Sequence, residues 1–151
     1  ITFNFSEMFN REMKAAGRGC HPISIMLVSA VPDPYSKEDI RENVDTVVNL
    51  FRKVLMAKSR DTDTVFHYGM NRLIFLLPFA DMEGAALVEK KVHGLFKTHS
   101  LIKRKNAGYR LITACVTFPQ DGKVKDKLLK KLESNFSRLL DFPGDTLNTT
   151  L

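Results

Sequence analysis

The sequence predicts an α+β fold in which a central, mainly antiparallel sheet is flanked by helices. Segments with helical and strand-like patterns follow one another in the order helix, strand, helix, two-stranded hairpin, helix, strand, helix. The inner part of this order is the βαββαβ pattern of ferredoxin-like sheets. With 151 residues and 44% hydrophobic content, the chain suits one core, so residues 1–151 are predicted to form a single domain.

The N-terminal segments predict one amphipathic helix and one buried strand. Asn4, followed three residues later by Glu7, is typical of a helix start. The apolar residues that then share one helical face, until Gly17 interrupts the pattern, are Phe5, Met8, Phe9, Met13 and Ala16. Residues 23–28 are almost continuously apolar and precede a turn signal at residues 32–34, so we expect the central strand of the sheet here.

The middle of the chain predicts a long helix and a hairpin. From about Ser36 to Ala57 a helical stripe is formed by Ile40, Val44, Val47, Val48, Phe51, Val54 and Leu55. Two runs rich in aromatic and branched residues, 65–68 and 73–77, then flank a short connection that contains Gly69. Because glycine supplies the permissive backbone that a tight connection needs, we expect a β-hairpin.

The C-terminal part predicts a helix, a strand and a second helix. A helix is expected to begin at Asp81, since the apolar residues after it are spaced by three and four. Tyr109 to Phe118 form a second mostly buried strand, closed by a turn at residues 119–122. The last helix ends near Leu140, and its apolar stripe consists of Val124, Leu128, Leu132, Phe136, Leu139 and Leu140.

The overall charge favours anionic partners without selecting one. Lys and Arg number 23 against 17 Asp and Glu, which gives a net charge of +6 and suits nucleotides, nucleic acids or acidic surfaces, or simply a well-solvated surface. Basic residues gather at 103–110 and 123–131, but no aromatic-interleaved recognition motif accompanies them. We therefore expect solvated faces there rather than a nucleic-acid interface.

The cysteines and the hydropathy pattern bear on the compartment. Cys20 and Cys115 are too few for a disulfide framework and lack a metal-binding spacing, so a reducing cytoplasm is the default expectation. No segment is apolar for long enough to span a bilayer. The chain begins with Ile1 and ends in a polar segment, from which we expect a domain excised from a longer protein.

The region around the hairpin contains a spaced series of motif residues. RDTD at residues 60–63 is followed by TVFHYGMNRL at 64–73 and by the apolar strand IFLLP at 74–78. This series resembles the GGDEF family, in whose intact members R-x-x-D precedes R-Y-G-G-D-E-F and a strand that ends in L-P. DMEGA at 81–85 and VTFPQDG at 116–122 resemble the family's next helix start and its strand-and-turn ending. The resemblance covers nearly the whole chain and implies a ferredoxin-like core of the nucleotide-cyclase type.

The departures from this family fall on the residues that carry its chemistry, the synthesis of cyclic di-GMP. Gly69 is retained, but the following Gly, Asp, Glu and Phe of the signature are replaced by Met70, Asn71, Arg72 and Leu73. The D-x-D that ends the first strand of intact members is Ser29-Ala30-Val31 here. In intact members these carboxylates hold two divalent cations, which need several, preferably anionic, oxygen ligands. We therefore expect a degenerate GGDEF-like domain that is not an enzyme, with no catalytic residues, no metal site and no cofactor.

The retained R-x-x-D motif implies a different use. In product-inhibited members the Arg meets a guanine edge or a phosphate of cyclic di-GMP and the Asp meets a guanine amino group, which assigns these contacts to Arg60 and Asp63. The alternative is a solvated ion pair in a loop, worth under ~1 kcal/mol.

A second, weaker nucleotide site is implied by two further positions. Asp45 aligns with a family Asp that recognises the guanine of GTP, although Ser36 or Lys37 stands where an Asn is expected. Arg72 offers a fork-like match to phosphate oxygens without a metal. The alternatives are that Asp45 is a polar residue on the exposed side of a helix and that residues 69–72 are only a turn.

These observations support three hypotheses. The first is a catalytically inactive, bacterial, cytoplasmic signalling domain that binds cyclic di-GMP through Arg60 and Asp63, helped by an Arg from a neighbouring helix or a second copy. The second is a ligand-independent module for homodimerisation or for contact with other domains of the parent protein or a partner protein. The third is a regulatory domain that binds GTP without metal.

Overall fold

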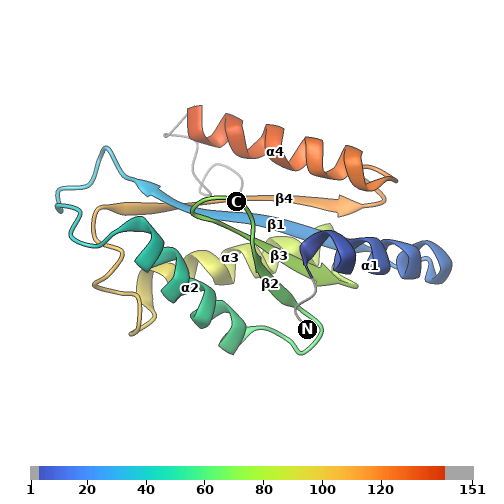
Figure 1. Ribbon diagram of the computed structural model, residues 1–151, viewed down its shortest axis with the longest axis horizontal. Helices are drawn as coiled ribbons and strands as arrows, with labels where there is room; N and C mark the ends of the chain where they lie inside the picture. Colours follow the sequence, from blue (N-terminus) through green and yellow to red (C-terminus); the bar gives the residue numbers. More distant parts are fainter. Residues whose placement is uncertain (1–3, 142–151) are drawn as a thin grey trace.

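The computed structural model describes residues 4–141, and its helices and strands occur in the predicted order. The elements, labelled in Figure 1, are α1 (Phe5–Gly19), β1 (Ile23–Pro32), α2 (Val44–Lys58), β2 (Thr64–His67), β3 (Arg72–Pro78), α3 (Met82–Thr98), β4 (Tyr109–Phe118) and α4 (Lys125–Asp141). The strands form one sheet in the order β2-β3-β1-β4, and every neighbouring pair is antiparallel. The predicted fold class and the central position of β1 are therefore confirmed.

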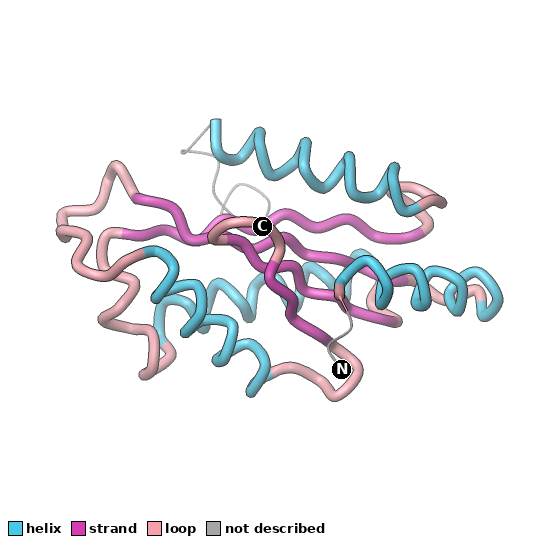
Figure 2. The backbone as a smooth tube through the Cα atoms, viewed as in Figure 1, coloured by secondary structure: helices cyan, strands magenta, loops and turns pink. Residues whose placement is uncertain are grey.

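Helices cover both faces of the sheet (Figures 1 and 2). Helices α2 and α3 pack on one face, where Phe51 and Phe96 meet with ring centroids 5.2 Å apart. Helices α1 and α4 pack on the other, through a cluster that includes Phe9 and Leu132. Alternate residues of β1 join the two clusters, which explains why its sequence is continuously apolar instead of alternating.

The starts of α1 and α3 are capped as their sequences predict. Asn4 Oδ1 accepts a hydrogen bond from Glu7 N at 2.8 Å, and Asp81 Oδ1 accepts one from Gly84 N at 2.7 Å. Each cap satisfies one of the backbone donors that a first helical turn leaves free. Helix α1 continues to Gly19, two residues past the expected break, because an interior glycine weakens a helix by only about 1 kcal/mol.

The predicted start of the second helix was wrong by eight residues. We expected it from about Ser36, but α2 begins at Val44, where Asn43 Oδ1 accepts a hydrogen bond from Asp45 N at 2.8 Å. The loop before α2 contacts the first residue of β4, since the hydroxyl of Tyr109 donates a hydrogen bond to the Glu42 carbonyl at 2.7 Å. Ile40, expected in the helical stripe, lies in this loop and is 47% exposed.

The hairpin was predicted correctly, and its tip lies beside the end of β1. Strands β2 and β3 pair with His67 opposite Leu73, and Tyr68 N donates to the Arg72 carbonyl at 2.9 Å. Gly69 and Asn71 have φ values of 71° and 60°, a left-handed conformation that glycine and asparagine tolerate best. Because Arg72 pairs with Ser29, the two altered motifs of the sequence meet here.

Within residues 4–141, no helix combines the length and the apolar character needed to cross a bilayer.

Candidate functional site

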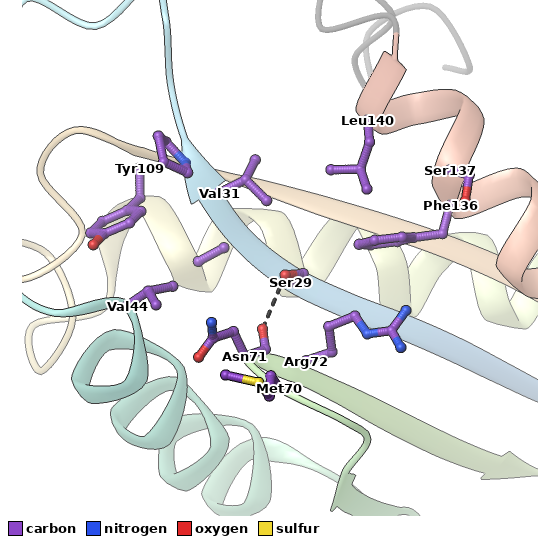
Figure 3. Close-up of a pocket in the computed structure, with 12 residues that line it drawn as sticks. Ser29, Val31, Val44, Met70, Asn71, Arg72, Tyr109, Phe136, Ser137 and Leu140 are labelled. Carbon is purple, nitrogen blue, oxygen red and sulfur yellow. Dashed lines mark hydrogen bonds between the residues drawn. The ribbon is translucent and has the colours of Figure 1, made fainter.

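A pocket of about 450 Å³ lies where the hairpin tip, the end of β1, the start of α2 and the last turns of α4 converge (Figure 3). The end of β1 contributes Ser29 and Val31, and the hairpin contributes Asn71 and Arg72. The remaining lining is mostly apolar and includes Val44, Met70, Tyr109, Phe136 and Leu140. The pocket therefore brings together both segments whose sequences depart from the GGDEF pattern.

The polar groups of this pocket are neutral apart from one guanidinium. Ser29 donates its hydroxyl to the Asn71 carbonyl at 3.0 Å, which joins the end of β1 to the hairpin tip (Figure 3). The side-chain oxygen of Asn71 is buried and accepts no hydrogen bond from any residue in the range 4–141. A buried acceptor without a partner costs free energy, so this atom can receive an N–H or O–H donor from a bound molecule.

Arg72 is held by α4. Its Nη1 lies 3.0 Å from Oε2 of Glu133, and its guanidinium carbon lies 5.3 Å from the Tyr68 ring centroid and 5.7 Å from that of Phe136. Burial, reinforced by the Glu133 charge, raises the pKa of the Tyr68 hydroxyl, while Arg72 opposes this effect. The positive charge at the hairpin tip is thus balanced by Glu133, and a phosphate at Arg72 would have to share or displace that carboxylate.

The residues at the tip do not fit a pair of divalent cations. Among the described residues that line the pocket there is no Asp or Glu, and Glu133 is committed to Arg72. A hydroxyl, an amide and a guanidinium are a poor ligand set for hard cations, which prefer several anionic oxygens. Nowhere between residues 4 and 141 do three or more His, Cys, Asp or Glu side chains form a group that could hold a metal ion.

Asp45 lies at the margin of this pocket. It is exposed in the first turn of α2, next to Val44, which does line the pocket. Asp45 is not among the lining residues, whereas Arg72 is. A joint GTP site of Asp45 and Arg72 stays a prediction.

Arg60 and Asp63 form a closed ion pair in the turn before β2. Arg60 Nη2 lies 2.7 Å from Asp63 Oδ1, its Nε donates to both carboxylate oxygens, and the main chain closes the turn with Asp63 N 3.0 Å from the Arg60 carbonyl. The hydrogen bond to Asp63 raises the pKa of Arg60. The Asp63 side chain is only 3% exposed, whereas that of Arg60 is 54% exposed. Arg60 is therefore open to a ligand, and Asp63 holds it in place.

Solved structures show which proteins share this architecture. A DGC protein from Thermotoga maritima superimposes with a TM-score of 0.68 at 17% identity, covering 87% of this chain and 91% of that one. The active GGEEF domain of a diguanylate cyclase from Vibrio cholerae gives 0.68 at 12% identity, covering 87% and 84%. The GGDEF domain of DgcB from Caulobacter crescentus, in complex with c-di-GMP, gives 0.68 at 9% identity, covering 91% and 80%.

The chain has the GGDEF-domain fold. At these identities the likeness establishes the fold alone. No protein-family model matches the sequence, and no match was found among curated proteins. Another protein with this fold, the diguanylate cyclase SiaD from Pseudomonas aeruginosa, was solved in complex with its activator SiaC.

The contribution of α4 to the pocket was not predicted from the sequence. Phe136 was recognised only as part of an apolar stripe, and Glu133 was not singled out. Glu133 lies 61 residues from Arg72 in the chain, and no local pattern predicts such a pair. The available signal was an acidic residue in the middle of a helix whose first two turns carry several lysines.

A polar network between α3 and β4 was also missed. Thr113 donates its hydroxyl to Glu89 Oε2 at 2.7 Å, and Nε2 of His93 lies 2.8 Å from the same hydroxyl oxygen. Burial lowers the pKa of His93 to about 4 and raises the pKa values of Glu89 and of the neighbouring Cys115. The network lies on the opposite side of the sheet from α4 and is separate from the pocket.

Proposed function

We propose that this chain is a regulatory domain with the GGDEF fold that does not synthesise cyclic di-GMP but binds it through Arg60. The observation that carries the first half is the lining of the pocket, where neutral side chains and Arg72, which is paired with Glu133 of α4, occupy the place that catalysis would need for carboxylates. Phosphoryl transfer depends on positioned positive charge around the triphosphate, supplied mainly by metal ions. A site that cannot concentrate those ions is a poor catalyst but can still recognise a ligand.

Arg60 supports the second half of the proposal. Its guanidinium is fixed in orientation by Asp63 and by a hydrogen bond from Nη2 to the Pro78 carbonyl at 3.1 Å, yet more than half of the side chain is exposed. A guanidinium donates well to guanine O6 and N7 and to phosphate oxygens, and neither contact needs a metal. Because the Arg60 side chain is already oriented, less conformational entropy is lost when a ligand binds to it.

The role of Asp63 in this proposal differs from that of a direct ligand contact. Its carboxylate is almost fully buried and faces Arg60, so a guanine amino group would reach it only after the ion pair opened. We therefore assign Asp63 to holding the Arg60 side chain in place.

Two measurements test the proposal. Calorimetric titration with cyclic di-GMP is expected to show saturable binding that weakens about tenfold or more in Arg60→Ala, since hydrogen bonds to charged groups contribute about 1.5–3 kcal/mol. Arg104→Ala, which removes an exposed arginine from a loop beyond α3, is the matched control and is expected to bind normally. Incubation with GTP and Mg²⁺, followed by chromatography, is expected to yield no cyclic di-GMP.

The results separate the parts of the proposal. Product formation by the purified protein would show that the pocket is catalytic after all. Normal binding in Arg60→Ala would place the ligand elsewhere. An absence of heat at high micromolar ligand would favour the second hypothesis, an interaction module. The closed Arg60–Asp63 ion pair is consistent with that hypothesis, because each side chain already has a partner. Light scattering across a concentration series would then show whether the partner is a second copy.

A further inference from the structure

An exposed aromatic residue next to Arg60 is held in a strained backbone conformation. Among residues 4–141, the non-glycine residues with positive φ are Cys20, Asn71 and Phe79, and Phe79 has φ 65°. A side chain with a Cβ is disfavoured in this left-handed region, where glycine or asparagine would be expected. Phe79 is also 60% exposed, so burial does not compensate for this conformation. Strain of this kind is often retained at functional sites.

Several contacts build this corner of the molecule. Phe79 N donates to the Pro22 carbonyl at 2.9 Å, and the His21 ring stacks on the Phe79 ring with centroids 4.1 Å apart and planes inclined by 27°. A Cβ atom at Gly19 would lie 2.9 Å from Cδ2 of His21, so the glycine leaves room for the imidazole ring. Cys20, which ends α1, is left-handed as well, with φ 56°. The chain thus presents a stacked aromatic pair at the surface.

The aromatic pair lies beside Arg60. Arg60 Nη2 donates to the carbonyl of Pro78, the residue that precedes Phe79. The pairing of Ile23 with Pro78 brings the start of β1, and with it His21, to the same corner of the sheet. A fixed guanidinium, the exposed Phe79 ring and the half-buried His21 ring therefore occupy one small surface.

We propose that Phe79, backed by His21, is the base-stacking residue of the cyclic di-GMP site, while Arg60 contacts a phosphate or a guanine edge of the same ligand. The inference rests on the proposed function and extends it to residues outside the R-x-x-D motif. A flat aromatic ring recognises the face of a nucleobase and a guanidinium recognises its edge or a phosphate, so together they suit a nucleotide rather than a simple anion. The His21 ring covers one face of Phe79 and leaves the base the other.

The first test removes the aromatic ring without disturbing the fold. Phe79→Asn keeps a residue that tolerates positive φ, and it is expected to weaken the binding of cyclic di-GMP by about tenfold, a typical effect of losing one base stack. The control is Tyr35→Asn, because Tyr35 is also aromatic and is 76% exposed. Tyr35 follows the C-terminal end of the ten-residue strand β1, whereas Phe79 lies near its start, so the two residues are about 30 Å apart. This control is expected to bind as the unmodified chain does.

The second test observes the stack directly. The chain contains no tryptophan, so Phe79→Trp introduces the single tryptophan of the chain at the proposed site. Saturating cyclic di-GMP is expected to quench its emission, with the same dissociation constant as calorimetry gives. Binding by Phe79→Trp without any change in emission would overturn the assignment.

The outcomes distinguish this inference from the proposal on which it rests. Binding that is lost in Arg60→Ala but unchanged in Phe79→Asn would uphold the proposed function and overturn the stacking role. Binding that is weakened in both variants and unchanged in Tyr35→Asn would support both. If the unmodified chain binds no cyclic di-GMP, the stacking role and the binding part of the proposed function are both wrong.

Discussion

His93 lies on α3 against β4, where burial lowers its pKa from 6.5 to about 4. Its Nε2 is 2.8 Å from the Thr113 hydroxyl oxygen. Because Thr113 donates its only proton to Glu89, the neutral histidine must donate from Nε2 to Thr113. The folded chain therefore binds a proton at His93 less readily than the unfolded chain does, and acid should favour unfolding.

The size of this effect follows from the two pKa values. A difference of 2.5 units corresponds to about 3.4 kcal/mol in full. The contribution is present above pH 6.5 and is lost as the pH falls toward 4, with about 2.4 kcal/mol lost between pH 7 and pH 4.5. This figure is an upper bound, because the partly accessible ring retains some solvation. The raised pKa of Glu89 has the opposite effect on stability as the pH falls. Glu89 is present both in the unmodified chain and in the His93→Gln variant.

Urea unfolding at pH 7 and pH 4.5 tests the prediction with His93→Gln. Glutamine keeps an N–H donor for Thr113 but does not titrate. We expect the free energy of unfolding of the unmodified chain to fall, relative to the variant, by up to about 2.4 kcal/mol between these pH values. His67→Gln is the matched control, because it makes the same substitution at an exposed position at the end of β2. A parallel loss of stability in the unmodified chain and in His93→Gln would refute the reasoning.

Three further substitutions test the packing of the fold by urea unfolding. Ser24→Ala should lower the free energy of unfolding by about 1–3 kcal/mol, because Ser24 donates to the buried Ala80 carbonyl at 2.8 Å; an unchanged midpoint would mean that water replaces the hydroxyl. Gly108→Ala should cost more than about 1 kcal/mol, since Gly108 has φ 81° and an added Cβ would lie 2.6 Å from Ile40; wild-type stability would show that the loop shifts freely. Asp81→Ala should cost about 1 kcal/mol by removing the cap of α3, whereas Asp81→Asn should retain most of it.

In the hairpin, the local sequence predicts the turn but not the charged partner of its arginine. Glycine between two strand-like runs predicts a tight turn, and the structure has that turn with Gly69 at positive φ. The partner of Arg72 was not predictable in the same way, because Glu133 lies on α4, 61 residues away in the chain. The sequence therefore located the altered signature, while the charge balance of the pocket followed from tertiary packing.

The loop before α2 shows the opposite case, in which a local pattern was misleading. Ile40 continues the apolar spacing of the helix, but Asn43 caps the helix later and Tyr109 anchors the intervening chain at Glu42. A helical period in the sequence says which residues could share a face, and it does not say where the helix begins. Contacts between residues 67 positions apart decided that point here.

Hydrophobic period and turn residues were enough to predict the order of the elements and the central strand, because these depend mainly on interactions between neighbours in the chain. The two altered motifs were recognised through the resemblance to the GGDEF family. The sequence also contained every residue of the stacked pair at His21 and Phe79, of the Arg72–Glu133 pair and of the Glu89–Thr113–His93 network. Their grouping became visible only when strands and helices distant in sequence were brought into contact, since burial, charge balance and pKa shifts depend on neighbours in space.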